Sequence, residues 1–113
     1  MKLREIVEQL KLDIVAGADK LDIDVTGGCV SDILSDVMAK APRGSIWVTN
    51  HTHQNVLALV FFKNLTGVII AGGMVLEEDA RQKALEKQIP VFQTRDNAFD
   101  VVGQLYQLGI RGH

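Results

Sequence analysis

The most concentrated set of chemically capable side chains is a polar segment of seven residues, Thr49 to Asn55, which separates two apolar runs. It carries two of the chain's three histidines. Imidazole changes its charge near neutral pH, hydrogen-bonds at both ring nitrogens and ligates metals, so the segment predicts a binding site. The candidate ligand-binding residues are Thr49, His51, Thr52, His53 and Asn55.

The two histidines leave three alternatives open. On a strand, His51 and His53 would share a face and both could reach a metal, but zinc sites use three or four protein ligands, and the sequence places no third one nearby. We therefore predict no metal site. One histidine is expected to hydrogen-bond a ligand or to cap the helix that follows, and Thr52 is an N-cap candidate. A plain surface turn is the third alternative.

Two glycine pairs offer places where a backbone could approach an anion. Thr26-Gly27-Gly28 and Gly72-Gly73 could donate N–H groups to a phosphate at the start of a helix, or they could form tight turns only. Gly67 to Gly72 has the glycine spacing of a phosphate loop, but Gly73-Met74 stands where lysine and a hydroxyl residue are required, so no NTP-hydrolysing core is expected. Arg95 is the cation best placed to pair with a phosphate.

Four other residues receive structural interpretations. Asp32 and Asp36 lie one helical turn apart and are interpreted as a solvated helix face rather than an acid/base pair. Cys29 falls in an apolar repeat, which favours a buried thiol over a reactive one. Trp47 could stack on a base, but core or subunit packing explains it at least as well. No catalytic residue is predicted.

Composition narrows the function classes. The chain has 113 residues, 47% of them hydrophobic, which suits one domain over residues 1–113. Twelve basic and 14 acidic residues give a net charge of -2, too balanced to favour nucleic acid or an anionic membrane. The one cysteine and the charged start, Met1 to Glu5, predict a cytoplasmic protein. A small polar ligand or a protein partner is expected, and no cofactor.

Helical and strand periodicities alternate along the chain. The segment Val56 to Phe62 is apolar throughout and fits a buried strand or a helix, and we favour a helix because it preserves the alternation. Asp96 is expected to cap the last helix and Gly109 to end it. The predicted helices cover residues 3–10, 29–38, 53–64, 77–87 and 97–108, and the predicted strands cover 12–16, 21–25, 46–48, 68–70 and 90–93.

Strands separated by single helices must mostly run parallel, so we predict an α/β layered domain with a mostly parallel sheet of about five strands flanked by helices. Ligands of such sheets bind beyond the carboxyl ends of the strands. The polar or small segments expected there are Gly17-Ala18, Thr26-Gly27-Gly28, Thr49 to Asn55, Gly72-Gly73 and Thr94-Arg95-Asp96.

The chain resembles the DRTGG domain family through Asp24-Val25-Thr26-Gly27-Gly28 and the following residues Cys29 to Ala39. The segments Trp47 to Asn55, Gly67 to Ile70 and Ile89 to Phe92 are similar to the family's order of elements. The resemblance implies a fold like the N-terminal domain of HPr kinase/phosphorylase, and regulation or assembly rather than catalysis. Val25 stands where the family's name has arginine, which removes a guanidinium suited to phosphate.

These observations predict a small non-catalytic regulatory or ligand-binding module that binds a nucleotide or another phosphate-bearing small molecule at the rim of its sheet. The alternative is a structural or protein-interaction module without a small-molecule ligand. Apolar residues on the third and fifth helices, including Phe61, Phe62, Phe99 and Tyr106, exceed what one small sheet needs. We therefore expect a homodimer, the simplest symmetric assembly.

Overall fold

The structure is a computed structural model that describes residues 1–112. Five strands form one sheet in the order β1-β5-β4-β3-β2. Neighbours among β2 to β5 run parallel, whereas β1 pairs antiparallel with β5 at one edge. The predicted layered α/β fold with a mostly parallel five-stranded sheet is confirmed. The strands are β1 (Asp13–Ala16), β2 (Gly27–Val30), β3 (Ser45–Thr49), β4 (Gly67–Ile70) and β5 (Val91–Gln93).

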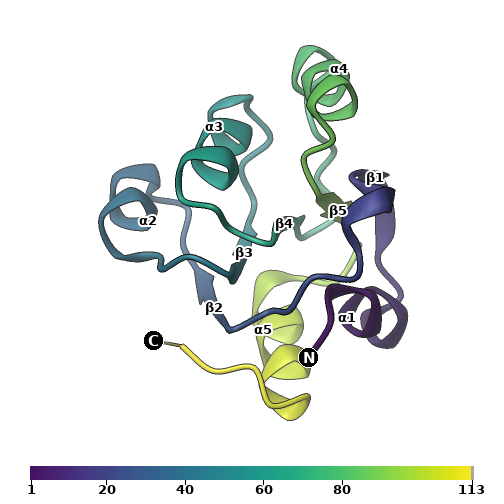
Figure 1. Ribbon diagram of the computed structural model, residues 1–113, viewed down its shortest axis with the longest axis vertical. Helices are drawn as coiled ribbons and strands as arrows, with labels where there is room; N and C mark the ends of the chain where they lie inside the picture. Colours follow the sequence, from purple (N-terminus) through teal and green to yellow (C-terminus); the bar gives the residue numbers. More distant parts are fainter. Residues whose placement is uncertain (113) are drawn as a thin grey trace.

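Helices cover both faces of the sheet (Figure 1). On one face lie α1 (Leu3–Leu10) and α5 (Ala98–Gln107), and on the other lie α2 (Leu34–Lys40), α3 (Asn55–Phe62) and α4 (Glu78–Lys87). A short 3-10 helix, η1, spans Ala18–Lys20. Within residues 1–112, no helix is both long and apolar enough to cross a membrane.

Ile46 to Val48 of β3 and Val68 to Ile70 of β4 are all apolar and buried, as expected of strands that helices cover on both sides. In β4, Ile69 packs into the core beneath α1 and α5, whereas Val68 and Ile70 pack into the core beneath α2, α3 and α4. Trp47 of β3 is fully buried in the second core, so its role is packing. Each such side chain contributes roughly 1.5–3 kcal/mol through burial.

The apolar segment 56–62 forms a helix, as predicted. Val56, Leu57, Leu59 and Val60 of α3 are buried against the sheet. Its last two residues are not, because Phe61 is 66% exposed and Phe62 is 70% exposed. The helix is therefore apolar on its solvent side as well as on its core side.

The predicted strand over 21–25 is wrong. Leu21 and Val25 are buried beneath α1, but the segment runs against the N-terminus with one isolated bridge, between Lys2 and Asp24. Its alternating pattern comes from this half-covered extended chain. The actual strand, β2, begins at Gly27, and the helix predicted from residue 29 therefore begins only at Leu34.

The last helix, predicted over 97–108, is one residue shorter at each end and has a different N-cap. The side chain of Asn97, not Asp96, caps α5, because Asn97 Oδ1 accepts a 2.9 Å hydrogen bond from the Asp100 amide. Gly109 follows the helix with φ +98°, which confirms it as the terminator.

Candidate functional site

Four parallel strands bring the loops that follow them to one edge of the sheet, which we call the carboxyl rim. It consists of residues 31–33 after β2, 50–54 after β3, 71–77 after β4 and 94–97 after β5. Of the predicted site residues, Thr49, His51, Thr52, His53, Asn55, Gly72, Gly73 and Arg95 lie on it or directly beside it.

Backbone hydrogen bonds join neighbouring rim loops. The Gly72 amide donates to the Asp96 carbonyl at 2.7 Å, and the Gly73 amide donates to the Thr94 carbonyl at 2.9 Å. On the other side, the Glu77 amide donates to the Thr52 carbonyl at 3.0 Å. These hydrogen bonds fix the polar segment after β3 relative to the loops that follow β4 and β5.

Asp32 organises the start of the polar segment. Its carboxylate accepts from the Thr49 hydroxyl at 2.7 Å and from the Asn50 amide at 2.8 Å. His51 Nε2 hydrogen-bonds the carbonyl oxygen of Asp32, so this ring faces the β2 loop. The amide hydrogen bond from Asn50, followed by that from the Thr49 hydroxyl, lowers the pKa of the Asp32 carboxyl.

The interpretation of Asp32 as part of a solvated helix face is wrong. Because α2 begins at Leu34, Asp32 lies in the loop before the helix and ties β2 to β3. Ser31 Oγ accepts from the Ile33 amide at 3.0 Å, which makes this loop a side-chain turn. Sequence reasoning missed Asp32 as a rim residue because it did not predict the strand before it, β2. Asn50 lies within the segment 49–55 that was predicted to reach the rim. Asp36 instead pairs with Lys40 at 2.9 Å on α2.

His53 and Thr52 begin α3 in a different way from the predicted cap. His53 Nδ1 accepts from the Asn55 amide at 3.1 Å, so a histidine does satisfy a donor of the first turn. The N-cap is Gln54, not Thr52. The Thr52 hydroxyl lies 3.4 Å from Glu77 Oε2 instead. His51 is held by the β2 loop and His53 by α3. Residues 1–112 contain no group of three potential metal-ligating side chains.

The glycines of the rim form a turn whose amides are already engaged. Gly72 and Gly73 have φ of +72° and +73°, which explains why glycine stands there. Their N–H groups point to the β5 loop rather than outward. A side chain added at Gly73 would meet open space. The pair therefore gives a ligand room but no free backbone donor.

Charge at the rim is mixed. Arg95 is exposed, and no ion pair to it occurs among residues 1–112. The carboxylates of Asp32, Glu77 and Asp96 are also exposed there. Asp96 accepts from Gln104 Nε2 at 3.2 Å. An anion can therefore approach most favourably at Arg95, next to the open turn.

The motif Thr26-Gly27-Gly28 does not lie on this rim. Because β2 begins at Gly27, the motif lies at the opposite edge of the sheet, and the prediction that it shares the rim is wrong. The Gly28 amide donates to the Arg111 carbonyl at 2.9 Å, and the Thr26 amide donates to the Gly44 carbonyl at 3.0 Å. Gly17-Ala18 is also at that opposite edge, because β1 is antiparallel.

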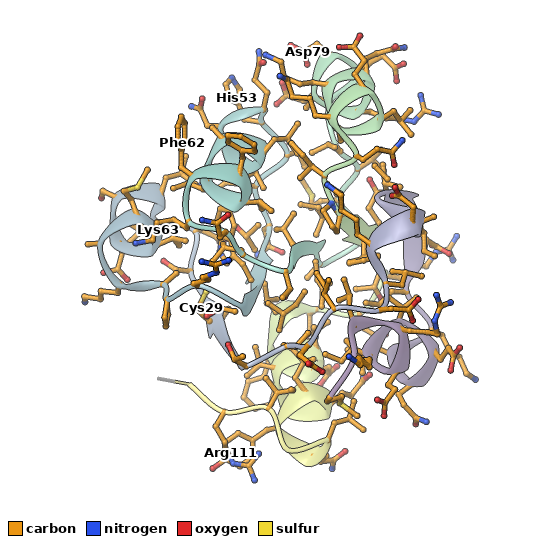
Figure 2. The ribbon with its side chains drawn as sticks, in the orientation of Figure 1. Cys29, His53, Phe62, Lys63, Asp79 and Arg111 are labelled. Carbon is orange, nitrogen blue, oxygen red and sulfur yellow. The ribbon has the colours of Figure 1, made fainter. Side chains whose placement is uncertain are left out.

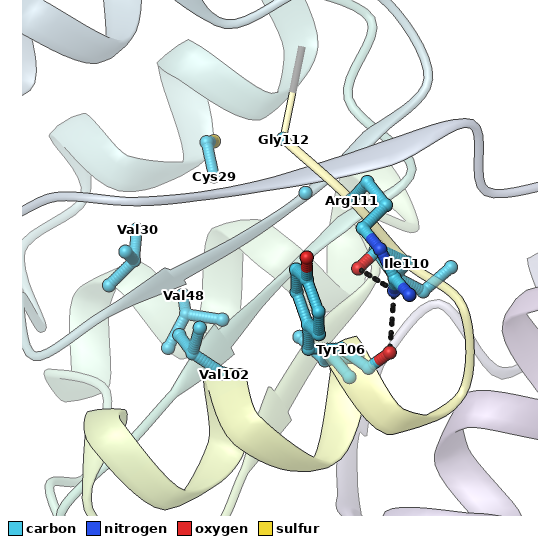
Figure 3. Close-up of a pocket in the computed structure, with 10 residues that line it drawn as sticks. Cys29, Val30, Val48, Val102, Tyr106, Ile110, Arg111 and Gly112 are labelled. Atoms are coloured by element: carbon cyan, nitrogen blue, oxygen red, sulfur yellow. Dashed lines mark hydrogen bonds between the residues drawn. The ribbon is translucent and has the colours of Figure 1, made fainter.

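A small cavity of about 170 Å³ lies beside β2, below the C-terminal segment (Figure 3). The Arg111 guanidinium lies 3.6 Å from the centre of the Tyr106 ring and donates to the Tyr106 carbonyl at 2.6 Å. Cys29 points to the other side of the strand from Tyr106. Cys29 is half-buried rather than fully buried as predicted, and its burial raises the pKa of the thiol to about 11, which favours a structural over a reactive thiol.

The fold can be compared with those of known proteins. No family model and no curated protein sequence matches the chain. Among solved structures, the chain is similar to the CBS and DRTGG domains of the regulatory region of Clostridium perfringens pyrophosphatase, a crystal structure in complex with its activator, diadenosine tetraphosphate. The TM-score is 0.70 at 14% identity, over 94% of this chain and 46% of that chain. The likeness establishes a related fold, and this chain spans less than half of that regulatory region.

Proposed function

We propose that the chain is a DRTGG-like regulatory domain of the cytoplasm that binds a nucleotide or another phosphate-bearing small molecule at its carboxyl rim, without catalysis. Two independent points support the family. The motif around Asp24 to Gly28 resembles it, and the fold is similar to a regulatory region that contains a DRTGG domain. That region binds a nucleotide activator, which supports a nucleotide as the ligand class.

One observation carries the proposed site: the β3, β4 and β5 loops meet beside an open turn that an exposed arginine flanks. Arg95 would pair with a phosphate through its planar guanidinium. The side chains of His53 and Asn55 would contact the rest of the ligand from the start of α3. The nearby carboxylates of Glu77 and Asp96 favour a ligand with few phosphates over a polyphosphate.

The same geometry gives each histidine a positioning role. His51 Nε2 hydrogen-bonds a carbonyl oxygen, and His53 Nδ1 accepts from a backbone amide. One nitrogen of each ring therefore holds a loop in place, which suits a binding site.

Thermal unfolding with adenine and guanine mononucleotides at millimolar concentration tests the proposal. A ligand at about ten times its Kd adds about 1.4 kcal/mol to the folded state, which raises Tm by several degrees. Arg95→Ala should remove the shift, and Arg43→Ala, an exposed arginine at the opposite edge, should keep it. Unchanged Tm with all the nucleotides would contradict the proposal.

A second candidate function is assembly through the α2–α3 surface. Met38 and Phe62 are exposed there, beside an apolar groove of about 360 Å³ that Leu34 and Leu59 also line. A second copy of the chain could cover this surface in a two-fold dimer. Sedimentation of the wild type should then show a dimer, and Phe62→Ser should show a monomer, with Leu85→Ser on α4 as the control. A wild type that is monomeric at high micromolar concentration would contradict this candidate.

A further inference from the structure

A groove of about 460 Å³ lies between α3 and α4 in the helical layer, and one end of it reaches the rim at His53 and Gln54. At one end of the groove, His53, which precedes α3, and Asp79 of α4 lie at neighbouring helix ends (Figure 2). Gln54 Nε2 lies 3.4 Å from Asp79 Oδ2 and bridges the two helices there. From this bridge, the groove extends along both helices to Ile89, which follows α4.

The floor and one wall of the groove are apolar. Leu57 and Ile89 line it and are buried, so they form its floor. Phe61 forms the wall on the α3 side. Its ring packs edge-to-face with that of Phe62, with 5.7 Å between the ring centroids. Because Phe61 is 66% exposed, its ring face is available to another planar group.

The opposite wall is basic. Lys83 and Lys87 line it from α4, one helical turn apart, and therefore lie on one side of the helix. Neither lysine forms an ion pair within residues 1–112, and no acidic side chain of that range lines the groove. An apolar floor between an aromatic wall and two unpaired cations is complementary to a molecule that has an apolar part and a negatively charged group.

The size of the groove favours a small molecule over a macromolecule as its ligand. Its volume falls within the roughly 300–1,000 Å³ typical of small-molecule sites. The eight residues of α3 extend about 12 Å, the length of two or three linked rings. An α-helix, about 10–12 Å in diameter with its side chains, would rest on top of the two helices without reaching the floor.

We propose that the α3–α4 groove binds a small aromatic anion, whose rings pack on Phe61 and Leu57 and whose carboxylate or sulfonate pairs with Lys83 and Lys87. The groove shares His53 and Asn55 with the rim at one end. Phe61, Lys83 and Lys87, which carry this proposal, lie away from the rim, so it does not depend on the nucleotide proposal. The two lysines would hold one anionic group while the groove removes the ligand's rings from water. This combination selects the ligand more strictly than an exposed ion pair would.

Fluorescence titration with 8-anilinonaphthalene-1-sulfonate tests this inference on the full chain, because this probe joins fused rings to one sulfonate. We expect saturable binding at one site. Lys83→Glu/Lys87→Glu should weaken it by about tenfold or more, since two favourable charge contacts become repulsive. The control Lys11→Glu/Arg43→Glu changes the net charge equally, and neither residue lines the groove. Its affinity should stay within about twofold of the wild type.

A second pair of variants tests shape instead of charge. Ala58 is exposed and borders the groove, so Ala58→Trp should fill it and abolish the fluorescence signal. Ala39→Trp adds the same bulk to α2 and should leave binding intact. Circular dichroism confirms that each variant is folded.

The proposal is overturned by an unsaturable probe signal, or by Ala58→Trp and the double lysine variant binding as the wild type does. Arg95→Ala separates the two sites: it should abolish nucleotide binding at the rim and leave the probe affinity unchanged. Loss of probe binding in Arg95→Ala would place the probe on the rim and would also overturn the groove site.

Discussion

The two edges of the sheet use glycine for different reasons. At the edge opposite the carboxyl rim, glycines are packed: a side-chain carbon at Gly17 would lie 2.5 Å from Pro90 Cα, and one at Gly67 would lie 3.1 Å from Pro90 Cβ. At the rim, Gly73 faces open space and Gly72 meets only the side chain of Asn50, at 3.2 Å. One edge is closed by packing, and the other leaves room beside its turns.

This difference shows which glycine motif has space for a ligand. Thr26-Gly27-Gly28 is the motif that carries the family resemblance, yet its surroundings are filled. A side-chain carbon at Gly28 would lie 3.2 Å from Ile110, and the C-terminal segment takes its amide. The less distinctive Gly72-Gly73 pair has the open surface. Resemblance and accessibility therefore identify different segments.

The largest effect on stability is expected from a substitution in the packed edge opposite the rim. Gly17→Ala combines a φ of +82° with a backbone clash at 2.5 Å, so we expect a loss of about 3 kcal/mol or more in the free energy of unfolding. Tm should fall by roughly 10 °C or more. Urea denaturation measures the loss, and a decrease below 1 kcal/mol would show that this edge is not closed by packing.

Gly73→Ala is the matched change at the open rim and should cost less. The added carbon meets no atom within 4 Å, so only the backbone strain of φ +73° remains, about 1–2 kcal/mol. The same urea experiment measures it beside Gly17→Ala. Equal losses for the two variants would refute the contrast between the edges.

The sequence predicted the elements that have a local signal and missed those that depend on pairing with distant segments. The rim loops of β3, β4 and β5 follow apolar strands whose periodicity is a local signal, and α3 was predictable from alternation. β2 was missed because Gly27-Gly28-Cys29-Val30 lacks the side chains typical of strands; it becomes a strand by pairing with β3. The antiparallel direction of β1 depends on its pairing with β5, which lies far away in sequence.

Asp32 gives a smaller, pH-dependent effect at the rim. Its pKa is lowered in the folded state by the Asn50 amide and the Thr49 hydroxyl, so its charge stabilises the fold above the pKa of an unfolded carboxyl. This contribution is lost as pH falls through the lowered folded pKa. For Asp32→Asn, we expect a loss of about 1 kcal/mol at pH 7, after allowance for solvent screening, which shrinks below about pH 4.

Urea denaturation of this variant between pH 2.5 and pH 7 checks both parts of the expectation. Asp36→Asn removes an exposed pair with Lys40 and serves as the control, with an expected loss under about 0.5 kcal/mol. A loss for Asp32→Asn that is independent of pH would show that its charge does not hold the β3 loop.

Thr52→Val should have the smallest effect. The hydroxyl of Thr52 lies 3.4 Å from an exposed Glu77 carboxylate, whereas the 3.0 Å bond between the same two residues joins the Glu77 amide to the Thr52 carbonyl. Valine keeps that backbone bond and the branched shape, so stability should change by less than about 0.5 kcal/mol. Amide hydrogen exchange at Glu77 should stay as slow as in the wild type. Faster exchange would mean that side chains, rather than the backbone, hold the rim loops together.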